Sequence, residues 1–374
     1  MMIKITPLKA LMPGKDIFDL MISDQVNGEM PKNEQLSFED LINLFGCALE
    51  NHPAIYIYEF RAESKSMRGI WAMTDLSETL TETIKRHEET MSSKVASLKT
   101  DKGKRKLEKS PILLVHKQEK GLTALIDWVI ANQKPLDSEW SQLGHFLYQV
   151  RDEALIDQFG AEFAKFDQVY LADGHHRLEA AYALQKTVPQ QISSLFVSAR
   201  SISIDAFHRL VRGIEVSPAI LMEKLKKYYT ISKIPNNKPY KPDRKNRMGL
   251  CINAEWYQLD LRKDLPYLLQ KPDTAILQDL VLEPMLGISN PKDDDRLSCF
   301  PDCKWNQFLA ELESSALTIG FSLFPMTADE FIATAEKGRF LPPKSTWIEP
   351  KIPQGFMASN PTAITAKGEQ IRLS

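Results

Sequence analysis

The sequence contains 374 residues, of which 43% are hydrophobic and 26% charged, and its formal net charge is −2 at pH 7. These values are typical of a globular protein long enough for two domains. The charge argues against a surface built for non-specific DNA binding, although it leaves a local basic patch open. No apolar stretch approaches the length of a membrane span, and the N-terminal residues lack the apolar core of a secretion signal.

The four cysteines are Cys47, Cys251, Cys299 and Cys303. They form no Cys-x-x-Cys pair, and Cys299 and Cys303 have no second paired cluster or flanking histidine, so they make a poor zinc site. We therefore expect reduced thiols and a cytoplasmic protein.

The N-terminal part mixes short strands with polar segments. Residues 7–13 are expected to be extended, and residues 38–49 have leucines near helical spacing. The runs at 55–60 and 69–73, separated by a polar turn, predict a β-hairpin. Residues 81–99 are rich in Glu, Lys and Thr and predict a helix. The charged run at 101–106 predicts an exposed loop, with a lid over phosphates as the alternative.

The predicted helix at 81–99 contains the run His87-Glu88-Glu89-Thr90. On a helix His87 and Thr90 share a face, and Glu88 points about 100° away. Met91 stands where a zinc protease has its second histidine, so the run is not a zinc motif. Spacing alone favours a solvated helix face.

From residue 111 onward, strand and helix patterns alternate. Strands are expected at 112–115, 146–150, 169–172 and 194–199, and helices at 123–131, 154–166 and 175–185. Later elements are a helix at 218–229, a hairpin at 249–253 and 257–261, a helix at 274–286, a strand at 315–324 and a helix at 328–337. This alternation is typical of a mixed α/β (α+β) protein.

The most informative stretch is Asp173-Gly174-His175-His176-Arg177, between a buried strand pattern and a helix pattern. The Asp-Gly dipeptide turns the chain sharply. At a helix start, unpaired backbone N–H groups and the positive end of the helix dipole favour a phosphate. The alternative is that Asp173 caps a helix whose exposed first turn carries the other polar groups.

A second polar stretch, Leu341-Pro342-Pro343-Lys344-Ser345-Thr346, superficially suggests a P-loop. A P-loop needs upstream glycines and a helix that starts at the lysine, whereas here two prolines precede and an extended Trp347-Ile348 follows. We reject the P-loop. Lys344 either reaches a phosphate from a proline-held turn or belongs to a surface turn.

The run Asp-Gly-His-His-Arg resembles the phosphate-binding signature of the ParB/sulfiredoxin-like superfamily, in which ParB proteins have Gly-Glu-His-Arg and sulfiredoxins Gly-Cys-His-Arg. The archaeal free-serine kinases belong to the same superfamily. Together with Pro-Pro-Lys-Ser-Thr, the run also makes the whole chain resemble the bacterial family called domain of unknown function 1015. This family's N-terminal Pro-Tyr-Asp element is absent from the sequence.

The resemblance implies further site residues. The family has a His-Glu-x-Thr element at His87-Glu88 and a Thr-His-Arg-Leu-Val element at Phe207-His208-Arg209, where a surface strand is the alternative. It implies nucleotide contacts from His87, Gly174, His176, Arg177, His208, Arg209, Lys344 and Ser345, and catalytic roles for Glu88, Asp173 and His175, with Asp173 also the metal ligand. We predict that His87, Glu88, His208 and Lys344 share one pocket with Asp173 to Arg177.

The implied fold has a ParB/sulfiredoxin-like core with additional N- and C-terminal α/β elements. We expect a nucleotide-site domain at 1–216, a second α/β unit closing on the site at 217–359, and a flexible tail at 360–374. The implied cofactors are ATP or ADP (or CTP) with Mg²⁺. The partners are a nucleotide and a small-molecule substrate, with no membrane, and a homodimer is left open.

Three functions remain open. The first is a nucleotide-dependent phosphotransferase that acts on a serine-like hydroxyl, with Glu88 or Asp173 accepting the proton. The second is a regulatory module that binds a nucleotide without turnover. The third, DNA binding as in ParB, lacks a clear helix-turn-helix and a basic balance. Sulfinic acid reduction is not expected, because His175 stands where sulfiredoxins have cysteine.

Overall fold

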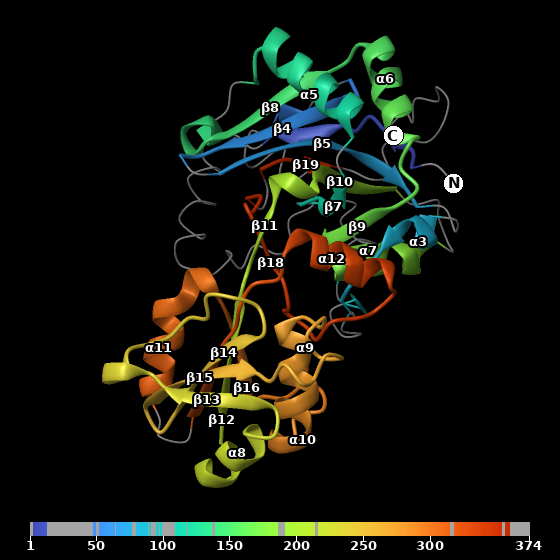
Figure 1. The fold of residues 1–374 in the computed structure, drawn as a ribbon. Helices are drawn as coiled ribbons and strands as arrows, with labels where there is room; N and C mark the ends of the chain where they lie inside the picture. The colour runs from blue at the N-terminus through green and yellow to red at the C-terminus, as the bar shows by residue number, and fades with distance from the viewer. Residues whose placement is uncertain are drawn as a thin grey trace. The chain divides into compact units, whose positions relative to one another are not determined.

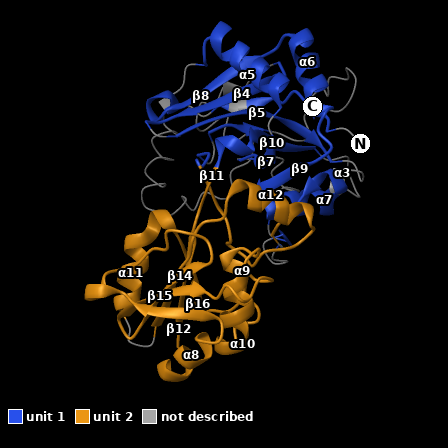
Figure 2. Ribbon diagram, in the orientation of Figure 1, with its two compact units in different colours: residues 1–86, 90–202, 350–374 blue, residues 87–89, 203–349 orange. Residues whose placement is uncertain are grey.

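The computed structural model divides the chain into two compact units. Unit 1 comprises residues 1–86, 90–202 and 350–374, and unit 2 comprises residues 87–89 and 203–349 (Figure 2). The structure describes residues 3–12, 48–49, 52–63, 65–76, 80–88, 90, 95–96, 98, 108, 110–117, 119–136, 139–185, 191–213, 216–314, 318–353 and 356–359. The prediction of a separate domain at 1–216 stays a prediction.

Unit 1 is built on a mixed sheet in the order β6-β9-β7-β10-β5-β4-β8, with β1 paired to β5. These strands are β1 (Ile5–Thr6), β4 (Ile55–Arg61), β5 (Ser66–Asp75), β6 (Ile84–Lys85), β7 (Ile112–His116), β8 (His145–Val150), β9 (Val169–Asp173) and β10 (Gln191–Ser198). The pairs β10–β7 and β6–β9 are parallel, and the others are antiparallel. A small sheet joins β19 (Ala358–Ser359), β2 (Ala10–Met12) and β3 (Ala48–Leu49).

Helices close the core of unit 1. They are α3 (Leu80–Thr83), α5 (Lys120–Asn132), α6 (Glu153–Phe163) and α7 (His175–Gln185). Figure 1 shows α5 and α6 on the same side of the sheet, where Leu122, Val129 and Phe159 are fully buried. Because β7 and β9 carry almost only aliphatic and aromatic residues, the centre of the sheet is buried on both faces. This buried sheet holds the ends of its strands in place, and the polar side chains at those ends with them.

Unit 2 contains an antiparallel sheet in the order β13-β15-β14-β17-β12-β16. Its strands are β12 (Phe207–Arg212), β13 (Tyr229–Lys233), β14 (Arg247–Ile252), β15 (Glu255–Leu261), β16 (Leu297–Pro301) and β17 (Thr318–Ser322). A separate ribbon pairs β11 (Ser203–Asp205) with β18 (Trp347–Glu349). The helices are α8 (Pro218–Leu225), α9 (Asp273–Leu277), α10 (Glu283–Leu286), α11 (Trp305–Glu313) and α12 (Ala328–Glu336).

The faces of the sheet in unit 2 have different cores. One face packs Val211, Leu250 and Leu259 against α8, α9 and α10, and the other packs Leu210 and Phe300 against Phe308 of α11. Adjacent residues of β12 therefore face opposite sides, as the two-residue period of a strand requires. A π-helical turn, Gln278–Leu282, joins α9 to α10.

The predicted α+β class and most predicted elements are confirmed, including the hairpin β4–β5, the hairpin β14–β15 and the strand-to-helix passage from β9 to α7. The predicted helix at 81–99 is wrong at its start. Helix α3 ends at Thr83, β6 pairs with β9, and Glu88 forms a parallel bridge with Leu341. Sheet pairing overrides a polar sequence pattern here.

Several predictions lie outside the described residues, namely most of the helix at 38–49, the loop at 101–106 and the tail at 360–374. In the part of the chain that the structure describes, no helix is long and apolar enough to cross a membrane. Among the described cysteines, Cys251, Cys299 and Cys303 form no disulfide.

Candidate functional site

The turn from β9 to α7 is shaped by Gly174. Its φ of +93° lies in the left-handed region, which a residue with a side chain rarely adopts. A Cβ added here would lie 2.8 Å from Ile112 Cγ2 and 3.0 Å from a guanidinium nitrogen of Arg177. Glycine therefore lets the Arg177 side chain fold back over the turn. The predicted position of the motif, at a strand-to-helix junction, is confirmed.

Two charged side chains of the turn face each other. Arg177 Nη2 donates to Asp173 Oδ2 at 3.0 Å, and Nη1 donates to the carbonyl of Ser110 at 2.8 Å. The Asp173 side chain is 54% exposed and that of Arg177 is 29% exposed, so solvent reaches both groups. Because guanidinium has five N–H donors and these bonds use two, Arg177 keeps donors for an anion.

The histidines of the turn differ in exposure. His175 is buried, and His176 is half-buried at the second position of α7. Gly174 precedes the helix and has no side chain to cap it, and the first N–H groups of a helix lack intrahelical partners. The turn thus places backbone donors, a half-buried imidazole and a guanidinium at one helix start, which suits a phosphate.

In unit 2, His87 lies against the segment that contains Lys344. Its carbonyl accepts a hydrogen bond from Leu341 N at 2.7 Å, and its Nε2 lies 3.1 Å from Thr346 Oγ1. The ring is fully buried and meets Phe331 edge-on at 4.7 Å between centroids. Glu88, next in sequence, is half-buried. His87 therefore ties residues 341–346 to α12.

Arg209 is a buried guanidinium that holds the same segment. It is 2% exposed and donates to the carbonyls of Phe207 at 3.2 Å, Pro343 at 3.3 Å and Lys344 at 3.0 Å. Among the described residues it makes no ion pair with a carboxylate. Instead, the carbonyl groups of Phe207, Pro343 and Lys344 point towards Arg209, and their dipoles balance its positive charge.

The turn itself holds Lys344 in an unfavourable backbone conformation. Lys344 has φ +56°, in a region that costs an ordinary L-residue roughly 1–2 kcal/mol. The Ser345 hydroxyl closes the turn by donating to Pro342 O at 2.5 Å. The Lys344 side chain is exposed. Backbone strain that the surroundings maintain is a recognised feature of functional sites.

His208 lies on the face of β12 opposite to Arg209. Its Nδ1 accepts from Leu323 N at 3.3 Å, so Nε2 carries the proton and donates to Asp302 Oδ1 at 3.0 Å. Burial lowers the pKa of His208, and this hydrogen bond, with Lys241, lowers the pKa of Asp302 to about 2. Both ring nitrogens are thus hydrogen-bonded, and the ring packs edge-on against Trp305.

Unit 2 therefore brings together His87, Arg209, Lys344, Ser345 and Thr346, whereas His208 lies apart from them. The sequence did not single out the carbonyls of Ser110, Pro343 and Lys344 as partners of the arginines, because backbone acceptors leave no mark in a sequence. The prediction that these side chains share one pocket with Asp173 to Arg177 stays a prediction.

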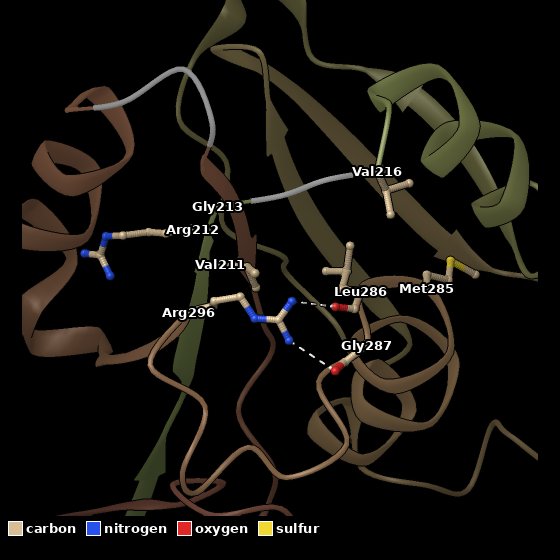
Figure 3. Close-up of a pocket in the computed structure, with 8 residues that line it drawn as sticks. All are labelled: Val211, Arg212, Gly213, Val216, Met285, Leu286, Gly287 and Arg296. Atoms are coloured by element: carbon tan, nitrogen blue, oxygen red, sulfur yellow. Dashed lines mark hydrogen bonds between the residues drawn. The ribbon is translucent and has the colours of Figure 1, made fainter.

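A cavity of about 270 Å³ in unit 2 is lined by other residues, among them Val216, Met285 and Arg296 (Figure 3). Arg296 donates to the carbonyls of Leu286 at 3.2 Å and Gly287 at 3.1 Å, and pairs with Asp294. Arg212, on the rim, pairs with Glu311. Arg296 thus holds the end of α10, and Arg212 links β12 to α11.

No group of three or more His, Cys, Asp or Glu side chains among the described residues is arranged to hold a metal ion. A Mg²⁺ ion that retains most of its water needs only one or two carboxylates plus substrate phosphates. Asp173, exposed beside the helix start, meets this smaller requirement.

The structure is that of a mixed α+β protein with a glycine-containing turn between β9 and α7. The chain belongs to the family described as "Protein of unknown function (DUF1015)", whose model matches residues 47–283. A search of the curated proteins found no match.

The solved structures that match this chain have low sequence identity and TM-scores below 0.5. A conserved hypothetical protein from Pyrococcus furiosus is 12% identical, with a TM-score of 0.40 over 76% of this chain and 93% of that one. C-terminally truncated SbnI from Staphylococcus aureus is 13% identical, with a TM-score of 0.42 over 74% and 82%. A free serine kinase in complex with AMP is 12% identical, with a TM-score of 0.40 over 76% and 88%.

Proposed function

We propose that the turn from Asp173 to Arg177 binds the phosphates of a nucleotide, and that the protein transfers a phosphoryl group to the hydroxyl of a small molecule. The observation that carries the proposal is the left-handed backbone of Gly174, which lets the Arg177 guanidinium lie beside the first backbone N–H groups of α7. Such a combination of charge-assisted donors and helix start recognises phosphate.

The motif adds support. Gly174, His176 and Arg177 match the Gly-x-His-Arg signature of the ParB/sulfiredoxin-like superfamily, which contains the free-serine kinases. The position between Gly174 and His176 holds the thiol of sulfiredoxins, and here it is a buried histidine. We therefore propose phosphate binding as the property that this chain shares with the superfamily, and a hydroxyl compound as its substrate class.

Asp173 has a separate part in the proposal. Its carboxylate, 3.0 Å from Arg177, repels an approaching phosphate unless a cation lies between them. A bound Mg²⁺ would link the carboxylate to the phosphates and neutralise charge that develops during transfer. Asp173 would then hold the metal, and Arg177 and His176 would hold the phosphates.

Replacing Arg177 with alanine is expected to weaken nucleotide binding by about one to two decades, because one charge-assisted contact is worth roughly 1.5–3 kcal/mol. Thermal-shift titrations with ATP, ADP, CTP and GTP in the presence of Mg²⁺ measure this loss. Arg177→Lys should recover part of the affinity, since lysine keeps the positive charge but cannot donate two parallel hydrogen bonds to one phosphate.

The matched control is Arg200→Ala, which removes an exposed arginine elsewhere in unit 1. It should leave the titrations unchanged. If no nucleotide shifts the wild-type protein, the phosphate site does not exist, and Asp173 and Arg177 are a surface ion pair at a helix start.

Asp173→Asn is expected to separate metal binding from phosphate binding. Without Mg²⁺ the variant should bind the nucleotide a few-fold more tightly than the wild type, because a repulsive charge worth roughly 1 kcal/mol is gone. With Mg²⁺ the wild type should gain affinity and the variant should not. Calorimetric titrations with and without EDTA measure both effects, and an identical Mg²⁺ response in the two proteins would contradict the metal role.

Turnover distinguishes the kinase from the regulatory module. ADP release from ATP in the presence of serine or other hydroxyl compounds, lost in Asp173→Asn, supports phosphotransfer. A nucleotide shift without ADP release for any of them would favour a module that binds a nucleotide and reports its state to a partner.

A further inference from the structure

Four buried side-chain oxygen atoms of unit 2, three of them on the helical stretch that begins with α9, have no hydrogen-bond partner among the described residues. Asp273 is 5% exposed, Thr274 7% and Gln278 8%, and each has a side-chain oxygen that no described residue contacts by a hydrogen bond. The Oδ1 atom of Asn246 shares this property. Buried polar atoms are nearly always satisfied, so four in one region call for a ligand.

Two of these residues are in contact, and the other two share a helix face. Asn246 N donates to Asp273 Oδ1 at 3.0 Å, so the two residues are in direct contact. Thr274 follows Asp273, and Thr274 and Gln278, four positions apart, lie on the same helix face. The left-handed backbone of Asn246, with φ +63°, turns the chain at this contact.

The unsatisfied oxygens of Asn246, Asp273 and Gln278 are acceptors, and the Thr274 hydroxyl can accept as well as donate. Asn246 Nδ2 donates to Leu269 O at 3.3 Å, and Gln278 Nε2 donates to Ile288 O at 2.8 Å. The amide orientations are therefore fixed by their nitrogens, and both carbonyl oxygens are left over. The nearby phenol of Tyr229 does not supply a donor, because its hydroxyl faces Met248 Sδ at 3.9 Å.

The charge of Asp273 is not balanced by a partner either. Lys245 forms its ion pair with Glu330, and no described cation pairs with Asp273. Ile276 and Leu277, which follow Asp273 in α9, belong to the apolar core of unit 2. Burial raises the pKa of Asp273 to about 7, and Glu330 adds to the effect while Lys245 opposes it. A lone carboxylate in such a place needs a positive charge or a proton.

We infer that Asp273, Asn246, Thr274 and Gln278 supply oxygen ligands for one monovalent metal cation, K⁺ or Na⁺, that stabilises unit 2. A single carboxylate matches a single positive charge, and the amide and hydroxyl oxygens are neutral hard ligands. A divalent ion would leave a net positive charge in an apolar region. The site is independent of the nucleotide site proposed in unit 1.

The test is a set of thermal unfolding curves at pH 8.5 in KCl, NaCl or N-methylglucamine chloride at equal ionic strength, with the full chain. We expect K⁺ or Na⁺ to raise the Tm of unit 2 by about 2–4 °C over the large organic cation, which cannot enter the site. The rise should saturate with cation concentration, as binding to one site requires.

The variant Asp273→Asn should abolish this difference, and Thr274→Val, which keeps the shape and removes one oxygen, should require several-fold more cation for the same rise. Asp279→Asn is the matched control on the same helical stretch, because Asp279 is 45% exposed and pairs with Lys271. It should retain the full cation effect. Equal Tm values in the three salts, or an undiminished cation effect in Asp273→Asn, would overturn the proposal and assign the oxygens to buried water.

Discussion

Acidification from pH 6.5 to pH 4 is expected to lower the stability of unit 1 by about 3 kcal/mol through His145 alone. The imidazole is 7% exposed, and its Nδ1 lies 2.7 Å from the hydroxyl of Tyr58. Four aromatic rings surround it, from Tyr58, Phe60, Trp140 and Phe356. Burial lowers the pKa of His145 from 6.5 to about 4.

The sign of the effect follows from proton linkage. Below pH 6.5 the unfolded chain binds a proton at His145 that the folded chain does not bind until about pH 4. Stability is therefore complete above pH 6.5 and falls as the pH drops towards 4. Urea unfolding monitored by tryptophan fluorescence across this range measures the slope.

His145→Gln tests the assignment, since glutamine can still accept a hydrogen bond from Tyr58 and does not titrate. Its stability should lack this component of the acid slope. His52→Gln, at an exposed histidine of the same unit, should keep it. If the slopes of the wild type and His145→Gln coincide, His145 is not the group that senses the pH.

Local sequence patterns predicted those elements whose own residues determine them. The aliphatic run of β9 followed by Asp-Gly and a helix period predicted the turn at Gly174, because a buried strand, a left-handed position and a helix each leave a local mark. The two prolines before Lys344 likewise excluded a P-loop, and the segment continues into the strand β18. These predictions needed no knowledge of distant contacts.

The segment around His87 could not be predicted in the same way. Its polar composition favours a helix, yet pairing of β6 with β9 and the bridge of Glu88 to Leu341 join residues far apart in sequence. The role of Arg209 has the same origin. The sequence indicated a His-Arg pair. Because neighbouring residues of β12 face opposite sides of the sheet, Arg209 reaches the Lys344 turn, whereas His208 packs on Trp305.

Replacing Arg209 with methionine is expected to destabilise unit 2 by about 3 kcal/mol. Methionine fills much of the space and removes the charge, but it leaves the carbonyls of Pro343 and Lys344 without their donor, and an orphaned buried carbonyl costs roughly 1–3 kcal/mol. Arg209→Lys should recover only part of the lost stability, because an ammonium group does not reproduce the planar set of guanidinium donors. Urea unfolding measures the loss of stability. A change below about 1 kcal/mol would mean that the turn around Lys344 keeps its conformation without Arg209.

Lys344→Gly is the informative counterpart, because it changes the residue that Arg209 positions. Glycine adopts φ +56° without strain, so relief of the left-handed conformation should stabilise the turn by roughly 1 kcal/mol. If Lys344 contacts phosphate, as the family resemblance implies, the same variant loses nucleotide affinity. A gain in stability together with a loss of binding is the result expected of strain kept for function. A gain in stability with unchanged binding would make Lys344 a residue of an ordinary surface turn, and Arg209 the brace of that turn alone.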